Sequence, residues 1–167
     1  SLRLAESQTG GVGGLRPARK GTLPSVEFAG VRFDNVPAIL NEDPGALPVE
    51  GGNLGLEMLK SFVVTIDTPG GAMYLQQTAD RLPLKRERAG IRTEHFGDRL
   101  KVMFVSRDGP AARSGLKAGD EIVAIDIRPV GKDYYSLPDW AHGEPGRSVT
   151  LGRSDGSTVQ LTLADYY

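Results

Sequence analysis

Asp67 lies in the stretch DTPGG, where a carboxylate stands close to glycine. Two such carboxylates that share a proton can hydrolyse a peptide bond with water when each sits on a glycine-containing loop. Pro69 argues against this chemistry, because it removes a backbone N–H and fixes φ where a catalytic loop uses a flexible glycine. The flanking runs FVVTI and AMYLQQ predict two strands, and Pro-Gly-Gly is typical of the turn between them. The sequence therefore predicts that Asp67 lies at the tip of a hairpin and is not catalytic.

Ser154 occupies the centre of GRSDG, residues 152–156, which matches the Gly-x-Ser-x-Gly pattern of a serine nucleophile. Such a nucleophile requires a strand followed by a helix, and a histidine later in the chain. Here STVQLTL continues as a strand and no histidine follows. A hairpin turn at Asp155-Gly156 is therefore the better interpretation.

The other motifs predict no metal and no cofactor. His95 and His142 are the only histidines and form no His-Glu-x-x-His pattern, so we expect both at the surface. The run GGVGG, residues 10–14, lacks the Lys-Ser/Thr of a phosphate-binding loop, and it predicts a flexible or edge segment instead.

The composition excludes several classes of partner. The formal net charge is −1 and no run of five like charges occurs, so nucleic acid is not an expected partner. There is no cysteine, which excludes a disulfide framework. No apolar run approaches the roughly 20 residues that span a bilayer, so no membrane span is expected. The sequence starts without methionine, and we expect a fragment; its compartment is undetermined, and would be periplasmic or secreted if an upstream signal precedes it.

The elements that must position any site are mostly short strands. The 167 residues include 22 glycines and 11 prolines, which fall between short apolar runs as in a strand-rich fold. Residues 26–33 predict a hairpin turned at Ala29-Gly30, and residues 56–61 predict one short amphipathic helix. The polar segment TADRLPLKRERAG, residues 78–90, contains Pro83 and predicts a domain boundary.

A second strand-rich unit follows this boundary. Pro110 and Gly115 predict the start and stop of a helix of little more than one turn, and Ser136 could cap a weaker helix through Trp140. The runs that we expect to form strands are residues 100–106, residues 121–127 and the hairpin of residues 148–163.

The stretch DGPAARSGLKAGDEIVAIDIRPV, residues 108–130, resembles a PDZ domain of the bacterial type, and the resemblance extends from about Leu84 to Leu163. It implies that a peptide is added as a strand to a sheet edge, with its terminal carboxylate held by clustered backbone N–H groups. The implied partners are peptide or protein C-termini. The implied peptide-binding residues are Ala89, Gly90, Ile91 and Arg92 in the carboxylate-binding loop and pocket floor, with Leu137 and Trp140 on the opposite helical wall.

The stretch VEGGNLGLEMLKSFVVTIDTPGGAMYLQQ, residues 49–77, resembles the end of a lobe in retropepsin-like aspartic proteases. In that comparison Gly52, Leu54 and Gly55 stand at the strand under the active site, and Asp67 falls on the hairpin beyond it. The family's catalytic Asp-Thr/Ser-Gly would lie upstream of this sequence, so the resemblance implies no catalytic residue here. The implied domains are a partial protease lobe over residues 1–79 and a PDZ domain over residues 80–167.

Together these observations predict a mainly β fold with short helices, in which a partial aspartic-protease-like β lobe is followed by a PDZ domain. The resemblance implies a C-terminal fragment of an aspartic endopeptidase, inactive alone, whose PDZ domain recruits or gates substrate. Two alternatives stay open: a non-enzymatic peptide-binding adaptor with a degenerate protease lobe, and a self-assembly protein. A truncated lobe would expose a strand edge, which favours a homodimer formed by edge pairing.

Overall fold

The computed structural model describes residues 2–11, 14–41, 52–79, 83–136 and 139–167. These residues divide into two compact units. The larger unit consists of residues 1–21, 39–42 and 86–167, and the smaller unit of residues 22–38 and 43–85. No helix among the described residues is long and apolar enough to cross a membrane.

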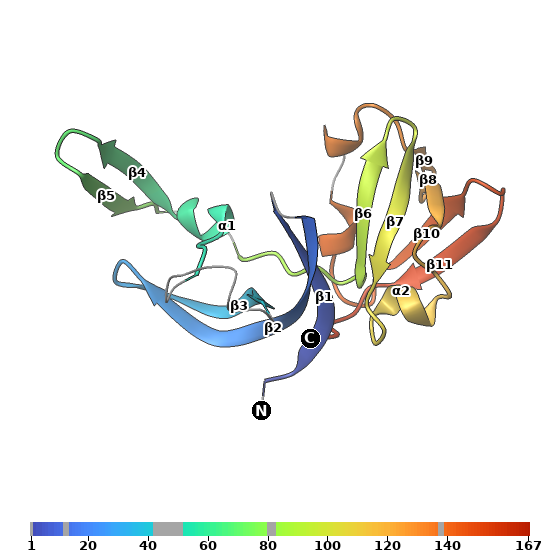
Figure 1. The fold of residues 1–167 in the computed structure, drawn as a ribbon, viewed down its shortest axis with the longest axis horizontal. Coiled ribbons are helices and arrows are strands. Elements are labelled where there is room, and N and C mark those ends of the chain that lie inside the picture. Colours follow the sequence, from blue (N-terminus) through green and yellow to red (C-terminus); the bar gives the residue numbers. More distant parts are fainter. Residues whose placement is uncertain (1, 12–13, 42–51, 80–82, 137–138) are drawn as a thin grey trace. The chain divides into compact units, whose positions relative to one another are not determined.

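The larger unit is built on a sheet in the order β11-β10-β8-β7-β6, with the short β9 beside β8 (Figure 1). Each neighbouring pair in this sheet is antiparallel. Alternating apolar residues of these strands form a buried core that includes Leu100, Ile122, Leu151 and Leu161. The strands are β6 (Ile91–Phe96), β7 (Arg99–Val105), β8 (Glu121–Ile125), β9 (Arg128–Pro129), β10 (Ser148–Arg153) and β11 (Thr158–Thr162).

Three short helical segments complete this unit. The helix α2 (Pro110–Arg113) has proline in its first turn and ends before Gly115, whose φ of +84° suits a residue that follows a helix. The predicted one-turn helix is therefore confirmed. The 3₁₀ helices are η2 (Tyr134–Ser136) and η3 (Trp140–His142). The weaker helix expected between Ser136 and Trp140 includes residues 137–138, which lie outside the described residues.

The first strand of the chain belongs to the larger unit. β1 (Leu4–Gly11) pairs antiparallel with the start of β2 (Gly14–Phe28). Ala5 in β1 is buried with Tyr166 and Tyr167, and the two tyrosine rings meet edge to face. β1 therefore belongs with the C-terminal residues in one unit, although they are far apart in the sequence. The assignment of residues 1–79 to one protease lobe stays a prediction.

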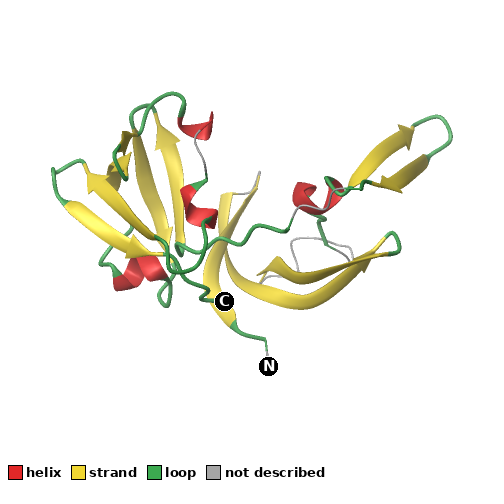
Figure 2. Cartoon of the chain, turned by 180° about the vertical axis from the view of Figure 1, so that it is seen from behind, coloured by secondary structure: helices red, strands yellow, loops and turns green. Residues whose placement is uncertain are grey.

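The described residues of the smaller unit form two hairpins and one helical turn, and strands dominate them as they do in the larger unit (Figure 2). β2 and β3 (Val31–Asn41) are neighbours in a three-stranded sheet, and the turn at Ala29-Gly30 has two positive φ angles, as a tight hairpin requires. The other elements are α1 (Leu56–Leu59), β4 (Phe62–Asp67) and β5 (Ala72–Gln77). The core of this unit consists of Val31, Phe33, Val36, Met58 and Phe62.

The predicted fold class is confirmed, because strands dominate both units and every helix is short. The helix expected over residues 56–61 is present but ends at Leu59, since the chain enters β4 at Phe62.

Candidate functional site

The candidate site is a cavity of about 300 Å³ beside the edge strand β6 of the larger unit. Among the predicted site residues, Gly90, Ile91, Arg92 and Trp140 line it. In the described part of the chain, β6 pairs with β7 on one side and ends the sheet on the other. A sheet edge offers backbone N–H and C=O groups for another strand. The cavity therefore adjoins a surface that can accept an extended peptide.

The loop before β6 is held closely against the start of α2. Ala89 is fully buried, and its carbonyl oxygen accepts the N–H of Ala111 at 2.8 Å. The Gly90 carbonyl accepts the N–H of Ser106 at 2.9 Å. A Cβ on Gly90 would lie 2.8 Å from the Gly109 Cα, and the φ of Gly90 is +73°. Only glycine fits this position, for both conformational and steric reasons.

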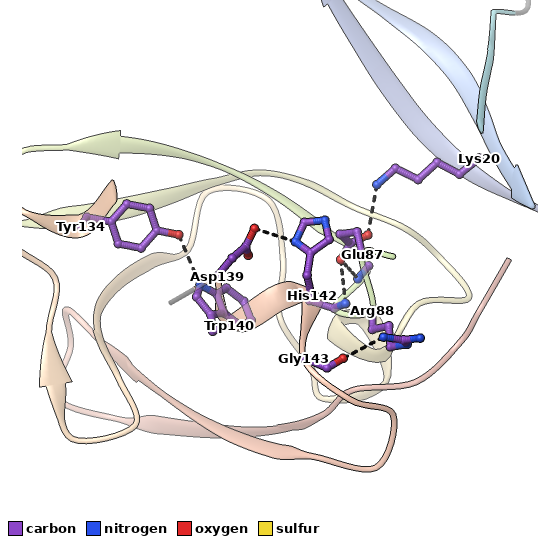
Figure 3. A network of polar contacts seen from close by, with 10 residues as sticks. Lys20, Glu87, Arg88, Tyr134, Asp139, Trp140, His142 and Gly143 are labelled. Atoms are coloured by element: carbon purple, nitrogen blue, oxygen red, sulfur yellow. Dashed lines mark hydrogen bonds and ion pairs between the residues drawn. The ribbon is translucent and has the colours of Figure 1, made fainter. Parts of the chain in front are cut away.

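Glu87 occupies the N–H groups of this loop. Its Oε1 accepts the backbone N–H of Ala89 at 2.6 Å and that of Gly90 at 2.7 Å (Figure 3). Its Oε2 accepts the Lys20 ammonium at 3.1 Å and the Tyr166 hydroxyl at 2.5 Å. The sequence analysis missed this residue. The only signal was an acidic side chain two positions before the loop, and such a residue also fits a solvated surface.

The pKa of Tyr166 is raised by its burial and by its position beside Glu87. Burial raises the pKa of Tyr166, and the charge of the Glu87 carboxylate and its hydrogen bond raise the pKa further. Tyr166 therefore stays protonated and donates its proton toward the carboxylate. The Glu87 side chain is only 12% exposed, so these bonds are largely shielded from water.

The opposite wall of the cavity is formed by η2 and η3. Trp140 is buried in the core of the unit, and its indole N–H donates to the Tyr134 hydroxyl at 3.3 Å (Figure 3). Burial raises the pKa of Tyr134. His142 Nδ1 lies 2.8 Å from Asp139 Oδ2. Leu137, the other predicted wall residue, lies outside the described residues.

Arg88 connects the loop before β6 to this wall. Its backbone N–H donates to the Ala141 carbonyl at 2.8 Å, and its guanidinium donates to the Gly143 carbonyl at 3.0 Å (Figure 3). The same guanidinium binds Asp165 Oδ1 at 2.7 Å. These bonds fix the position of η3 relative to the loop.

Arg92 follows the loop on β6, next to a register shift in the pairing with β7. Its guanidinium donates to Glu94 Oε1 at 2.7 Å on the same strand. The arginine therefore lies at the cavity with its charge already paired.

Asp67 and Ser154 belong to hairpins, whereas His142, which was expected at the surface, lines the cavity. Asp67 ends β4 at a hairpin turn, where its Oδ1 accepts the N–H of Gly70 at 2.9 Å. Ser154 lies in the exposed turn between β10 and β11. No group of three or more potential metal ligands occurs among the described residues. Both hairpin predictions are confirmed.

The comparisons with known proteins confirm the PDZ domain. Residues 88–164 match the PDZ domain family model. The chain is also similar to a solved variant of the HtrA-type protease AlgW with a decapeptide, at 20% identity and a TM-score of 0.43, over 97% of this chain and 58% of that one. It is similar to AlgW with a tripeptide at 19% identity and a TM-score of 0.41, over 97% of this chain and 64% of that one. No curated protein matches the sequence.

This chain therefore spans 58% to 64% of the length of those two solved chains. The comparisons give no support for a retropepsin-like lobe.

Proposed function

We propose that the larger unit binds an extended peptide segment by adding it as a strand to the free edge of β6. The observation that carries this proposal is the cavity lined by β6, by η3 and by residues of β1 such as Ser7 and Gln8, beside the edge at which the described sheet ends in β6. PDZ domains recognise peptides by strand addition, in which backbone hydrogen bonds give affinity and side-chain pockets give specificity.

In this proposal, apolar side chains of the cavity contact a ligand side chain, and the β6 backbone binds the ligand backbone. Ile91, Phe104, Trp140 and Ala141 line the cavity and provide a surface for an apolar ligand side chain. The backbone of β6 provides the N–H and C=O groups that pair with the ligand backbone. Because Trp140 and Ala89 are buried in the core, we expect Ile91 and Ala141, which are only half-buried, to make most of the ligand contacts.

Fluorescence anisotropy with a library of short labelled peptides tests this function. We expect saturable binding of a subset of peptides to the wild-type chain. Ala141→Arg fills the cavity from η3 and should weaken binding at least about tenfold, which corresponds to about 1.4 kcal/mol. Gln160→Arg adds the same charge to the exposed face of β11 and should leave binding unchanged. Equal binding by both variants, or no binding by the wild type, would contradict the proposal.

The protease-lobe resemblance supports a second proposal, which concerns the longer protein of which this chain would be a fragment. Leu54, Met58, Phe62 and Leu75 belong to one apolar cluster, which brings together residues of the segment before α1, of α1 and of the β4–β5 hairpin. We propose on this basis that the smaller unit is part of an aspartic endopeptidase lobe whose activity requires a catalytic motif that this chain lacks. Incubation with an unfolded protein between about pH 3 and 7 should yield no cleavage. The appearance of cleavage products would overturn this proposal.

A further inference from the structure

The carboxylate of Glu87 binds to the loop that the PDZ resemblance assigns to the carboxylate of a ligand. The two backbone N–H groups at the centre of the loop, those of Ala89 and Gly90, both donate to Glu87 Oε1 (Figure 3). Distances of 2.6 and 2.7 Å are short, as expected for N–H groups that bind a charged acceptor. These two donors are therefore already used within the folded chain.

The other carboxylate oxygen of Glu87 also accepts two hydrogen bonds. Glu87 Oε2 accepts the Lys20 ammonium from β2 and the Tyr166 hydroxyl from the C-terminal segment. An ionised carboxylate has about four acceptor positions, so these four donors saturate it. Lys20 also supplies the opposite charge, 3.1 Å away. Glu87 is consequently bound in place from three separate segments of the larger unit.

We infer that Glu87 is an internal substitute for a ligand carboxylate, so the groove selects extended peptide segments without requiring a free C-terminus. This inference rests on the proposed function, because it specifies the class of peptide that the groove takes. A second carboxylate at the loop would find both N–H groups occupied and would meet the like charge of Glu87. Recognition then depends on the β6 backbone and the apolar lining.

Matched pairs of peptides test this inference. Each binding peptide from the library, ending in an apolar residue, is synthesised as a free acid and as a C-terminal amide, and both are titrated by fluorescence anisotropy. We expect the wild type to bind the two forms with affinities that agree within about twofold, because no donor distinguishes them. A preference of about tenfold or more for the free acid would overturn the inference while leaving the proposed function intact.

Two substitutions distinguish the effect of the Glu87 hydrogen-bond acceptor from the effect of its negative charge. Glu87→Ala frees the N–H groups of Ala89 and Gly90, so this variant should gain a preference of about tenfold for the free acid. Glu87→Gln keeps an oxygen acceptor in the same place and should bind the two forms equally. Equal binding of acid and amide by a folded Glu87→Ala chain would overturn the inference.

Two further outcomes are also decisive. If Glu87→Ala fails to fold, the wild-type and Glu87→Gln comparisons still decide, since a free-acid preference in the wild type contradicts the inference. If neither the wild type nor Glu87→Ala binds any peptide, the proposed function and this inference both fail. Binding of the free acid by Glu87→Ala alone would overturn the inference, because the wild-type groove would then accept no peptide.

Discussion

The hydroxyl of Tyr166 donates to Glu87 Oε2 at 2.5 Å, across 79 positions of sequence. This bond joins the C-terminal segment to the carboxylate that accepts the N–H groups of Ala89 and Gly90. Lys20 reaches the same oxygen from β2. The loop is therefore held by contacts from β2 and from the C-terminal segment.

Tyr166→Phe should lower the free energy of unfolding by about 2 kcal/mol at neutral pH, because it removes a hydrogen bond to a charged group. The fluorescence of Trp140, the single tryptophan, reports urea unfolding of the larger unit. Tyr135→Phe is the control, since Tyr135 is 81% exposed, and it should cause no change. Equal stability of the two variants would contradict the role given to the Tyr166 bond.

The raised pKa of Tyr166 also predicts a loss of stability at alkaline pH. The folded chain keeps this hydroxyl protonated above the ordinary tyrosine pKa of 10.0, whereas the unfolded chain releases the proton. The contribution is therefore fully present below about pH 10 and falls as pH rises above it. Urea unfolding at successive pH values should show this decline, and Tyr166→Phe should make it shallower. If the free energy of unfolding falls with pH equally steeply in Tyr166→Phe, the decline does not come from Tyr166.

Gly90→Ala should lower the free energy of unfolding by about 2 to 5 kcal/mol, because the new Cβ adds a clash with Gly109 to the strain of a positive φ. Gly97→Ala is a matched control: its φ of +65° is similar, but no atom lies within 4 Å of the added Cβ. That control should lose only about 1 to 2 kcal/mol. Equal losses in urea unfolding would show that the loop has room for a side chain.

Asp67→Ala should remove the hydrogen bond to the Gly70 N–H, at a cost of about 1 kcal/mol in local stability. Asp67→Asn keeps an oxygen acceptor and should preserve the turn. Hydrogen exchange of the Gly70 amide, followed by NMR, distinguishes these cases, with faster exchange expected in the alanine variant alone. A cleavage activity that both variants lose would instead make Asp67 a catalytic residue.

The hairpin of β4 and β5 exposes apolar side chains, including Ile66 at 69% and Tyr74 at 61%. A two-stranded hairpin with such a surface is marginally stable alone, so we expect it to pair with a second copy. Light scattering should show a mass that rises with concentration for the wild type and stays constant for Ile66→Lys. A wild type with the mass of one chain at every concentration would refute self-association.

The sequence predicted the elements whose signals are local. The Pro-Gly-Gly turn predicted the β4–β5 hairpin, and Pro110 with Gly115 predicted α2, because turn and cap residues act through their own backbone angles. Gly90, Ile91, Arg92 and Trp140 were predicted from the PDZ resemblance, and all four line the cavity.

The remaining features depend on contacts between distant segments. Nothing local marks Glu87 as a partner of Lys20 and Tyr166, since those residues lie 67 and 79 positions away. The inclusion of β1 in the larger unit has the same origin, because it rests on the contact of Ala5 with Tyr166 and Tyr167.

The most direct test of peptide binding at β6 is NMR mapping of a library peptide onto the wild-type chain. We expect saturating peptide to shift the backbone amide signals of Ile91–Phe96 and Trp140–His142 and to leave those of the β10–β11 hairpin in place. Shifts confined to other segments, or no shifts at any peptide concentration, would contradict peptide binding at β6.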